Sequence, residues 1–326
     1  MTRLTVRAER WPLPAPFVIA RMRMEAAEVV VVEIERDDHI GRGEADRIED
    51  VLAGRTAVLD AIEEARPAIE AGADRAALQD LLPAGPARSA LDCALWDLEA
   101  KVTGAPVWRL AGLDAPLRPL TTVFTLGLDT PEAMAKAARA ANRPILKLKL
   151  GGEGDLERVA AVREAAPEAR LSVDANTGWS DAHMAAYPEP LAALGVELIE
   201  QPFPPGEDHR LDGIASPIPL AADESCLDRN SLSALEGRYK YINIKIDKAG
   251  GLTEALALAK AARAKGFSIM VGCNVATSLS MAPGVVLGQL ARFVDLDGPL
   301  LLARDRSPSL AYDGATLHPP DPTLWG

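Results

Sequence analysis

Beyond about residue 116, short runs of apolar and β-branched residues alternate with longer stretches in which apolar residues recur every three or four positions. The short runs predict buried strands, and the longer stretches predict amphipathic helices. The predicted helices include 131–141, 156–165, 253–265 and 278–290. The predicted strands are 121–126, 145–150, 171–175, 197–201, 219–223, 241–246, 268–272 and 293–296.

These eight predicted strands are separated by crossovers that are long enough for parallel pairing. Eight alternating units within roughly 175 residues are what a closed barrel of parallel strands requires. An open doubly wound sheet is the alternative, but the glycine fingerprint that binds phosphate in such sheets is missing. We therefore expect an α/β protein with a TIM-type barrel.

The first third of the chain has a different pattern. The β-branched run 29–34 predicts a strand, helical spacing then continues from about Arg55 to Leu82, and a second amphipathic helix is predicted over 89–101. Strands followed by helices favour a separate α+β domain. The tail is rich in Pro and Gly and is expected to return to this domain. The predicted divisions are a capping domain at 1–115, a barrel at 116–300 and a returning segment at 301–326.

Composition narrows the class of protein. The net charge of −12 has no clustered basic face, which argues against nucleic-acid binding. No apolar run is long enough to span a membrane, and the first residues lack the apolar core of a secretory signal. Three widely spaced cysteines fit reduced thiols. We therefore expect a cytoplasmic enzyme with a small-molecule substrate, without membrane or nucleic-acid partners; a homo-oligomer is possible.

Three carboxylates, Asp174, Glu200 and Asp223, close the apolar runs of successive predicted strands. The carboxyl ends of the strands build the active site in barrels of this type, so these side chains should converge. Their repulsion and desolvation would be costly unless a cation held them, and hard oxygen ligands favour Mg²⁺, with Mn²⁺ possible. Any one of these carboxylates could instead cap the following helix or pair with a neighbouring base, but this alternative accounts less well for all three at successive strand ends. The sequence therefore predicts one Mg²⁺ per subunit.

Lysines occupy the predicted strands on either side of these carboxylates. Lys147 and Lys149 lie two residues apart, and so on one face, in the strand before Asp174, whereas Lys245 ends the strand after Asp223. The amines should therefore flank the metal on opposite sides. Lys248, in contrast, fits a solvated lysine at a strand end.

Removal of a proton α to a carboxylate needs this arrangement. A divalent metal offsets the developing charge, and a lysine base must be neutral, which burial and nearby positive charge favour by lowering its pKa. Lys147 and the metal would supply that charge beside Lys149. Lys149 and Lys245 are the predicted bases, and together they permit removal of a proton on one face and its return on the other.

The same residues resemble the enolase superfamily and, within it, the muconate-lactonising-enzyme subgroup. The resemblance covers nearly the whole chain and implies a modified TIM-type (β/α)7β barrel with an α+β capping domain formed by the N-terminal region and the C-terminal tail. It also implies Mg²⁺ stabilising an ene-diolate beside lysine bases. The matching motifs are Lys147-x-Lys149, Asp174-Ala-Asn176, Glu200-Gln-Pro202, Asp223-Glu-Ser225 and Asn243-Ile-Lys245-x-x-Lys248-x-Gly250-Gly251.

Asp295-Leu-Asp297, at the end of the eighth predicted strand, narrows the resemblance to the dipeptide epimerases, above all those acting on L-Ala-D/L-Glu. There an Asp-x-Asp holds the ammonium of the substrate's N-terminal residue. The alternation of side chains along a strand is consistent with this role, because it puts both carboxylates on one face, where they would select a cation. The alternative is that the two aspartates cap or form a turn before Gly298. The implied reaction is a 1,1-proton transfer at the α-carbon of the C-terminal residue of an L,L-dipeptide, in muropeptide recycling.

The resemblance also implies that selectivity for the substrate side chain comes from capping-domain loops, which here lie near Arg21 and after Glu44. Arg21 or Arg23 would meet a glutamate carboxylate or be a surface charge, and Thr125 would help to position the substrate. N-acylamino-acid racemisation, o-succinylbenzoate synthesis and cycloisomerisation remain alternatives, although their substrates carry no free ammonium. A His-dependent site is disfavoured, because the four histidines are predicted in loops, helices or the tail: His39, His183, His209 and His318.

Overall fold

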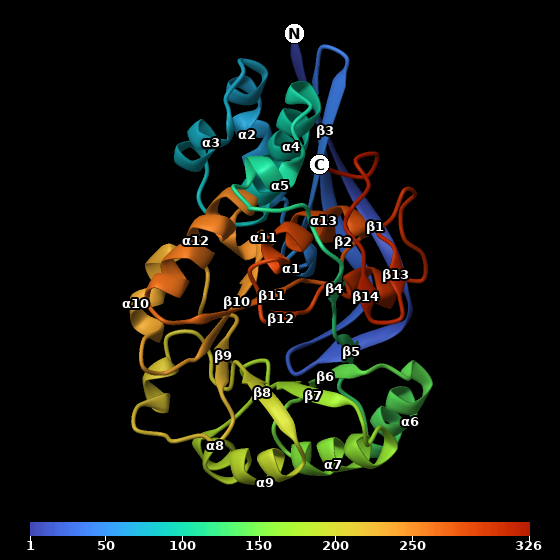
Figure 1. Cartoon of the computed structure of the whole chain (residues 1–326), viewed down its shortest axis with the longest axis vertical. Helices are drawn as coiled ribbons and strands as arrows, with labels where there is room; N and C mark the ends of the chain where they lie inside the picture. Colours follow the sequence, from blue (N-terminus) through green and yellow to red (C-terminus); the bar gives the residue numbers. More distant parts are fainter.

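The computed structural model describes all 326 residues, and its central feature is an eight-stranded parallel sheet with the order β12-β11-β10-β9-β8-β7-β6-β5 (Figure 1). Val123 N, next to β5, donates a hydrogen bond of 3.0 Å to Val294 O of β12, which joins the two edges of the curled sheet. The predicted parallel barrel is therefore confirmed. Its strands are β5 Phe124–Leu126, β6 Ile145–Lys149, β7 Arg170–Asp174, β8 Val196–Glu200, β9 Leu220–Ala222, β10 Tyr241–Lys245, β11 Ser268–Gly272 and β12 Phe293–Val294.

Helices connect these strands and lie on the outside of the sheet. The four predicted helices are present with ends shifted by at most two residues, whereas the crossover from β8 to β9 contains only the 3₁₀ turn η1. None of the helices combines the length and apolar character needed to cross a membrane. The connecting elements are α6 Pro131–Ala141, α7 Asp155–Ala165, α8 Asp181–Ala186, α9 Pro188–Ala193, η1 Asp208–Leu211, η2 Arg229–Ser231, α10 Leu232–Leu235, α11 Ile246–Ala249, α12 Leu252–Ala264, α13 Ser278–Gly288 and η3 Gly298–Leu301.

The inside of the barrel changes from apolar to polar along the strands. A small buried cluster, with Phe293 packed against it, fills one level: Leu198, Ala221, Tyr241 and Met270. Because side chains alternate with period two, the residues two positions further along point into the same interior. That next level carries Glu200, Asp223, Asn243, Gly272 and Asp295. The barrel therefore has an apolar floor and a polar mouth at the carboxyl ends of its strands.

The capping domain is built on the antiparallel sheet β1-β2-β3, with strands Thr2–Ile19, Met22–Arg36 and His39–Asp46. Val29 and Val31 of β2 face the main core, and Val30 and Val32 face a second core under the cap helices. Burial on both faces explains the uninterrupted apolar run that predicts this strand. The cap helices are α1 Ile48–Leu52, α2 Ala57–Glu70, α3 Arg75–Leu81, α4 Pro86–Thr103 and α5 Val107–Leu110.

Three expectations are wrong in detail. The long helical stretch up to Leu82 is two helices, α2 and α3, because the chain turns at Gly72 with φ of 99°. The predicted strand 121–126 is also two strands: β4 (Leu120–Thr121) leaves the barrel sheet and pairs with β14 (Thr316–Leu317) of the tail, which pairs with β13 (Tyr312–Asp313). The eighth strand, β12, ends at Val294, so Asp295 and Asp297 follow it rather than end it.

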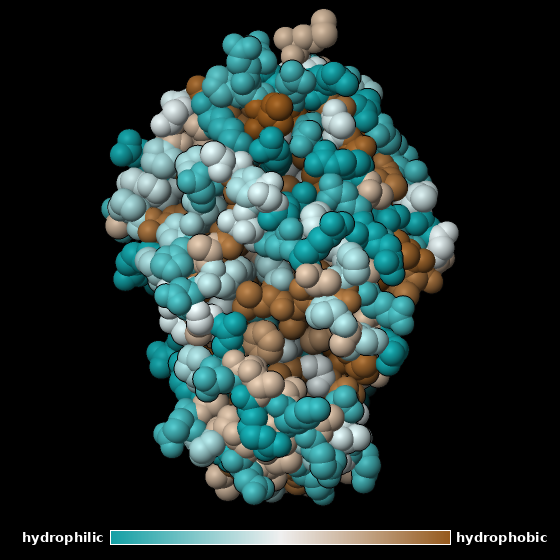
Figure 2. Space-filling model, turned by 90° about the vertical axis from the view of Figure 1, so that its right-hand side faces the viewer, coloured by the Kyte–Doolittle hydropathy of each residue, from teal (hydrophilic) through white to brown (hydrophobic).

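The β1–β2 hairpin and the tail connect the cap to the barrel. Ala20 and Arg21 form the hairpin turn, and Val18 O accepts a hydrogen bond of 2.8 Å from Leu128 N, beyond β5. Arg306 of the tail bonds to Glu9 of β1 at 2.8 Å. Figure 2 views the molecule from the right-hand side of Figure 1. It shows apolar side chains gathered across the middle of this face, at about the level of the hairpin tip in Figure 1. The hairpin tip thus lies at the barrel mouth.

Candidate active site

The structure brings the three predicted metal ligands together. Asp174 and Glu200 are the last residues of β7 and β8, and Asp223 directly follows β9. All three are at most 1 % exposed, and they offer carboxylate oxygens that lie within 4.8 Å of one another. Asn243 Nδ2 donates to Glu200 Oε1 at 2.8 Å, and a Cβ at position 272 would lie 2.4 Å from Asn243 Oδ1. The absence of a side chain at Gly272 therefore leaves room for the Asn243 amide, which orients the carboxylate of Glu200.

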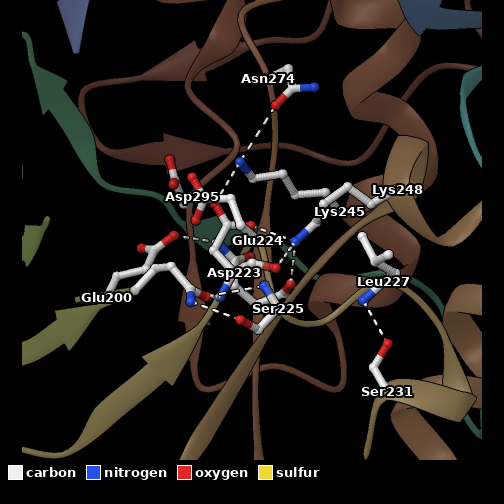
Figure 3. Close-up of polar contacts among 12 residues, drawn as sticks. Glu200, Asp223, Glu224, Ser225, Leu227, Ser231, Lys245, Lys248, Asn274 and Asp295 are labelled. Carbon is white, nitrogen blue, oxygen red and sulfur yellow. Dashed lines mark hydrogen bonds and ion pairs between the residues drawn. The ribbon is translucent and has the colours of Figure 1, made fainter. Parts of the chain in front are cut away.

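Lysines surround this cluster as the alternation predicts. Lys245 Nζ lies 2.8 Å from Asp223 Oδ2 (Figure 3). Lys149 Nζ lies 2.6 Å from Asp174 Oδ2, so each of the two predicted bases contacts a different carboxylate. Lys248 also contacts Asp223, and its side chain is only 17 % exposed. The interpretation of Lys248 as a solvated lysine is therefore wrong.

The ionisation of the cluster is uneven. Burial acts to raise the pKa of Asp174, but Lys149 and Lys147 outweigh it and lower that pKa to about 2. Lys245 and Lys248 likewise lower the pKa of Asp223 against its burial. Burial and Asp174 raise the pKa of Glu200 to about 8. Asp174 and Asp223 are therefore ionised beside their lysines, whereas Glu200 holds a proton near neutral pH that a bound metal ion would displace.

A hard divalent cation fits this donor set. The ligand atoms are all carboxylate oxygens, with no imidazole or thiolate among them. Oxygen-only sites suit Mg²⁺ and Mn²⁺ rather than Zn²⁺. Such an ion would replace the lysines as the counter-charge of Asp174 and Asp223, which would leave Lys149 and Lys245 available to a substrate.

Lys147 links this cluster to the second pair of carboxylates. Its buried Nζ lies 2.8 Å from Glu200 Oε2, 3.2 Å from Asp174 Oδ2 and 2.7 Å from Asp295 Oδ2. Burial lowers the pKa of Lys147, but the surrounding carboxylates raise it well above its usual value. Lys147 therefore stays charged, as expected for a residue that supplies positive charge beside Lys149.

Asp295, Asp297 and Thr125 also come together. Thr125 N donates a hydrogen bond of 2.6 Å to Asp297 Oδ2. Burial and Asp295 raise the pKa of Asp297 to about 7. The two carboxylates and the thiol of Cys273 offer ligand atoms within 4.8 Å of one another. This pair is a buried negative site that a cation would stabilise.

A cavity of about 100 Å³ at the barrel mouth connects Lys149 and Lys245 with Asp295 and Asp297. A cleft of about 530 Å³ adjoins it beneath the capping domain, and the two share the lining residues Arg21, Asp46, Ile48, Glu49, Lys245 and Asn274. Both arginines are exposed, but Arg21 lines both spaces, with its Nη2 3.0 Å from Glu224 Oε1, whereas Arg23 lines neither. Of the two candidate arginines, the structure therefore selects Arg21. The cavity is lined by Lys149, Lys245, Thr125, Asp295 and Asp297, and on the cap side by Phe17, Ile19, Arg21, Met22, Met24, Asp46, Ile48 and Glu49.

Several site residues were missed by the sequence analysis. Asn243 was named in the matching motifs but given no role; alternation along β10, which puts it two residues before Lys245 on the same face, could have assigned it to the site. Asp46 and Asn274 gave no such signal, because they meet only when the cap packs on the barrel; Asn274 Nδ2 donates to Asp46 Oδ2 at 2.9 Å. The histidines lie elsewhere, and His39 begins cap strand β3 rather than a loop.

Family models match both parts of the chain. Residues 1–112 match the mandelate racemase/muconate lactonizing enzyme N-terminal domain, and residues 131–321 match the enolase C-terminal domain-like family. The chain belongs to the enolase superfamily. The resemblance stated from the motifs is therefore confirmed, together with the barrel and the capping domain.

Relatives within the superfamily are epimerases and racemases. The chain is 44 % identical to L-Ala-D/L-Glu epimerase of Escherichia coli, over 98 % of this chain and 100 % of that protein. It is 47 % identical to an N-acetyl-D-glutamate racemase of a Pseudoalteromonas species, over 76 % of this chain and 79 % of the relative.

Solved structures agree with the fold over its whole length. An enolase family member from Agrobacterium tumefaciens with homology to dipeptide epimerases, solved with sodium and L-Ala-L-Glu, superposes with a TM-score of 0.96 at 43 % identity and full coverage of both chains. Dipeptide epimerase from Methylococcus capsulatus, complexed with Mg and L-Arg-D-Lys, gives 0.88 at 32 % identity, covering 98 % of this chain and 97 % of that one.

Proposed function

We propose that this chain is a dipeptide epimerase that inverts the α-carbon of the C-terminal residue of an L,L-dipeptide, with L-Ala-L-Glu as substrate and muropeptide recycling as its role. One observation carries the proposal: a single cavity contains Lys149 and Lys245 as well as Asp295 and Asp297. A dipeptide is a zwitterion with its carboxylate and ammonium a fixed distance apart. Its two ends therefore match a cationic site and an anionic site in one cavity.

In this proposal Asp174, Glu200 and Asp223 hold Mg²⁺, which when bound offsets the negative charge that develops on the substrate carboxylate. Lys149 and Lys245 act at the α-carbon: one removes the proton from one face, and the other delivers a proton to the opposite face. An amine held by a carboxylate is a poor base, so each lysine must turn from Asp174 or Asp223 toward the substrate. Lys147 keeps its proton and stays between the two acidic groups.

The remaining residues select the substrate. Asp295 and Asp297 receive the ammonium of the N-terminal residue, and Thr125 fixes Asp297 through its backbone N–H. Arg21, at the hairpin tip, would exchange its contact with Glu224 for the side-chain carboxylate of a glutamate. Charge-assisted bonds of this kind favour an acidic residue at the inverted position.

N-acylamino-acid racemisation is the second candidate, and one observation favours it. Lys147 already lies 2.7 Å from Asp295 Oδ2, so part of the negative charge offered to an ammonium is satisfied within the protein. A relative of this chain is an N-acetyl-D-glutamate racemase. Such a substrate has an amide in place of the free ammonium.

The test compares L-Ala-L-Glu with N-acetyl-L-glutamate in D₂O with Mg²⁺, reading α-deuterium by mass and D-glutamyl product by chiral chromatography. We expect deuterium and inversion in the dipeptide, none with chelator, and much slower exchange in N-acetyl-L-glutamate. Faster turnover of N-acetyl-L-glutamate would replace the proposal by the second candidate. Exchange in neither compound, nor in a mixed L,L-dipeptide library, would contradict both.

A further inference from the structure

Lys245 and Lys149 differ in the hydrogen bonds that their amines make to residues other than the metal-site carboxylates. Lys245 Nζ donates to Asn274 Oδ1 at 3.4 Å as well as contacting Asp223 (Figure 3). No side-chain amide accepts a hydrogen bond from Lys149, whose partner is Asp174. Asn274 follows β11, and it lines both the cavity and the adjoining cleft. The two predicted bases are therefore not equivalent.

The capping domain fixes which end of the Asn274 amide faces Lys245. An amide has an acceptor oxygen and a donor nitrogen, and an ionised carboxylate only accepts. Asn274 Nδ2 donates to Asp46 Oδ2 at 2.9 Å, which turns Oδ1 toward the lysine. Asp46 is itself held, because its Oδ1 accepts from Ile48 N at 2.9 Å and its backbone N donates to Asp247 Oδ2 at 3.1 Å.

A neutral acceptor suits a lysine that must act as a base. A carboxylate holds an amine but stabilises its charged form, whereas an amide oxygen directs an N–H with much less effect on the charge. With one N–H directed to Asn274, the lone pair of a neutral Lys245 is restricted in the directions it can take. Orientation of this kind decides how often the amine reaches the α-carbon in a reactive geometry.

We propose that Asn274 is a positioning residue for Lys245 and that Asp46 of the capping domain fixes its orientation, so that the cap controls one base and not the other. This inference rests on the proposed two-base reaction. It goes beyond that reaction because it predicts an asymmetry between the two faces of the α-carbon.

The test follows α-deuterium incorporated at early times into each recovered epimer, L-Ala-L-Glu and L-Ala-D-Glu, in D₂O. It is run above the pKa of Asp46, which burial and Asp247 raise to about 7. Lys149→Ala and Lys245→Ala first identify which epimer each lysine deprotonates. Asn274→Leu then removes the side-chain amide but keeps a side chain of similar volume. Asp46→Asn keeps the shape of the Asp46 side chain but no longer fixes the orientation of the Asn274 amide.

We expect Asn274→Leu to slow exchange of the epimer that Lys245 deprotonates by on the order of 10²-fold, because misplacement of a reacting group by about 1 Å costs that much. Exchange of the other epimer, which needs only Lys149, should stay near the wild-type rate. Asp46→Asn should show the same asymmetry with a smaller loss.

Thr277→Val is the matched control. Thr277 lies in the same loop as Asn274, and its Oγ1, which valine lacks, donates to Glu44 Oε2 of the same cap strand as Asp46 at 2.5 Å, without contacting Lys245. It should affect both epimers alike or neither. Equal loss for both epimers in Asn274→Leu, or no loss, would overturn the inference.

A crystal structure of Asn274→Leu separates this inference from the proposed function. Lys245 Nζ should move relative to the wild type while Lys149 keeps its place, whatever the substrate is. An unmoved Lys245 would overturn the inference even if the dipeptide activity is confirmed. Absence of dipeptide turnover in the wild type would instead contradict the proposed function, and the same exchange test would then use the substrate found.

Discussion

Two acidic groups share the barrel mouth, and they differ in how their charge is balanced. Asp174 and Asp223 of the first group each touch lysines, which hold their pKa values below the usual range. In the second group burial and Asp295 raise the pKa of Asp297 to about 7. Lys147 lies between the groups and contacts both.

This difference indicates two kinds of cation site. In the first group Asp174 and Asp223 stay ionised whether or not a ligand is present, because their lysines supply positive charge, and only Glu200 must lose a proton to bind a divalent ion. The second group has one shared lysine and a carboxyl group that titrates near neutrality, so it gains most when a cation arrives with the substrate. A buried acid pair is stabilised by a transient ammonium in the way that a metal stabilises the first group.

The largest effect should follow from removing the lysines of the first group. Lys149→Ala and Lys245→Ala should each reduce epimerisation by about 10²- to 10⁴-fold, the usual contribution of a positioned acid or base. Mg²⁺ binding should survive or strengthen, since each substitution removes a positive charge beside a metal ligand. Calorimetric titration with Mg²⁺ and circular dichroism check binding and folding, and wild-type turnover in either variant would refute the two-base mechanism.

Neutralising the second group should separate substrate binding from metal binding. Asp297→Asn should lower kcat/KM for L-Ala-L-Glu by about 10²-fold or more, because a buried ammonium left without its partner costs about 3–5 kcal/mol. N-acetyl-L-glutamate should be unaffected or improved, and Mg²⁺ affinity should not change. Equal losses with both compounds would mean that Asp297 has a structural role instead.

Lys147 connects the two groups, so its loss should affect both. Lys147→Met keeps the length of the side chain and leaves Asp295 and Glu200 without their shared counter-charge. The metal-free protein should lose about 3 kcal/mol of stability, as expected when one partner of a buried ion pair is removed. Added Mg²⁺ should raise the Tm of this variant by more than it raises the Tm of the wild type. A Tm response to Mg²⁺ equal to that of the wild type would contradict the shared role.

The raised pKa of Asp297 predicts a pH dependence of dipeptide binding to the Mg²⁺-loaded enzyme, in which Glu200, whose pKa is also raised, would already be ionised as a metal ligand. An ammonium binds the ionised carboxylate, and Asp297 loses that form as pH falls through about 7. Dipeptide affinity should therefore fall by at most about tenfold per pH unit below 7, and binding near pH 7 should release a proton. Calorimetry in two buffers of different ionisation enthalpy measures that proton. N-acetyl-L-glutamate should show no such release.

The sequence predicts the site residues that the barrel strands alone bring together, but not those that meet only between the capping domain and the barrel. Asp174, Glu200, Lys149 and Lys245 were predictable because strand alternation and barrel topology fix both their face and their end of the barrel. Asp46 and Asn274 were not, since their contact depends on how the cap packs on the barrel. The division of the chain at 115 and 300 likewise stays a prediction.

Strand β1 shows the same limit within the fold. Its 18 residues include Pro12, Pro14 and Pro16, and its register shifts between Pro12 and Phe17, so prolines interrupt the pattern by which a strand is predicted. Nothing local predicts that this strand pairs with β2 along almost its whole length. As a result the sequence offered Arg21 or Arg23 as the cation, and could not exclude a surface charge for either, although only Arg21 of the two lines the cavity.

Arg21 gives the smallest expected effect and extends the comparison to the cap side of the cavity. Arg21→Met removes the contact with Glu224, and with it the cation proposed to meet a glutamate side chain. KM for L-Ala-L-Glu should rise about tenfold or somewhat more, because a hydrogen bond to a charged group contributes about 1.5–3 kcal/mol. Turnover of L-Ala-L-Leu should be unchanged or faster, and Arg23→Met is the matched control that should change neither. If Arg21→Met slowed both dipeptides equally, Arg21 would shape the cavity rather than select an acidic side chain, and the ammonium site at Asp295 and Asp297 would be left as the main source of recognition.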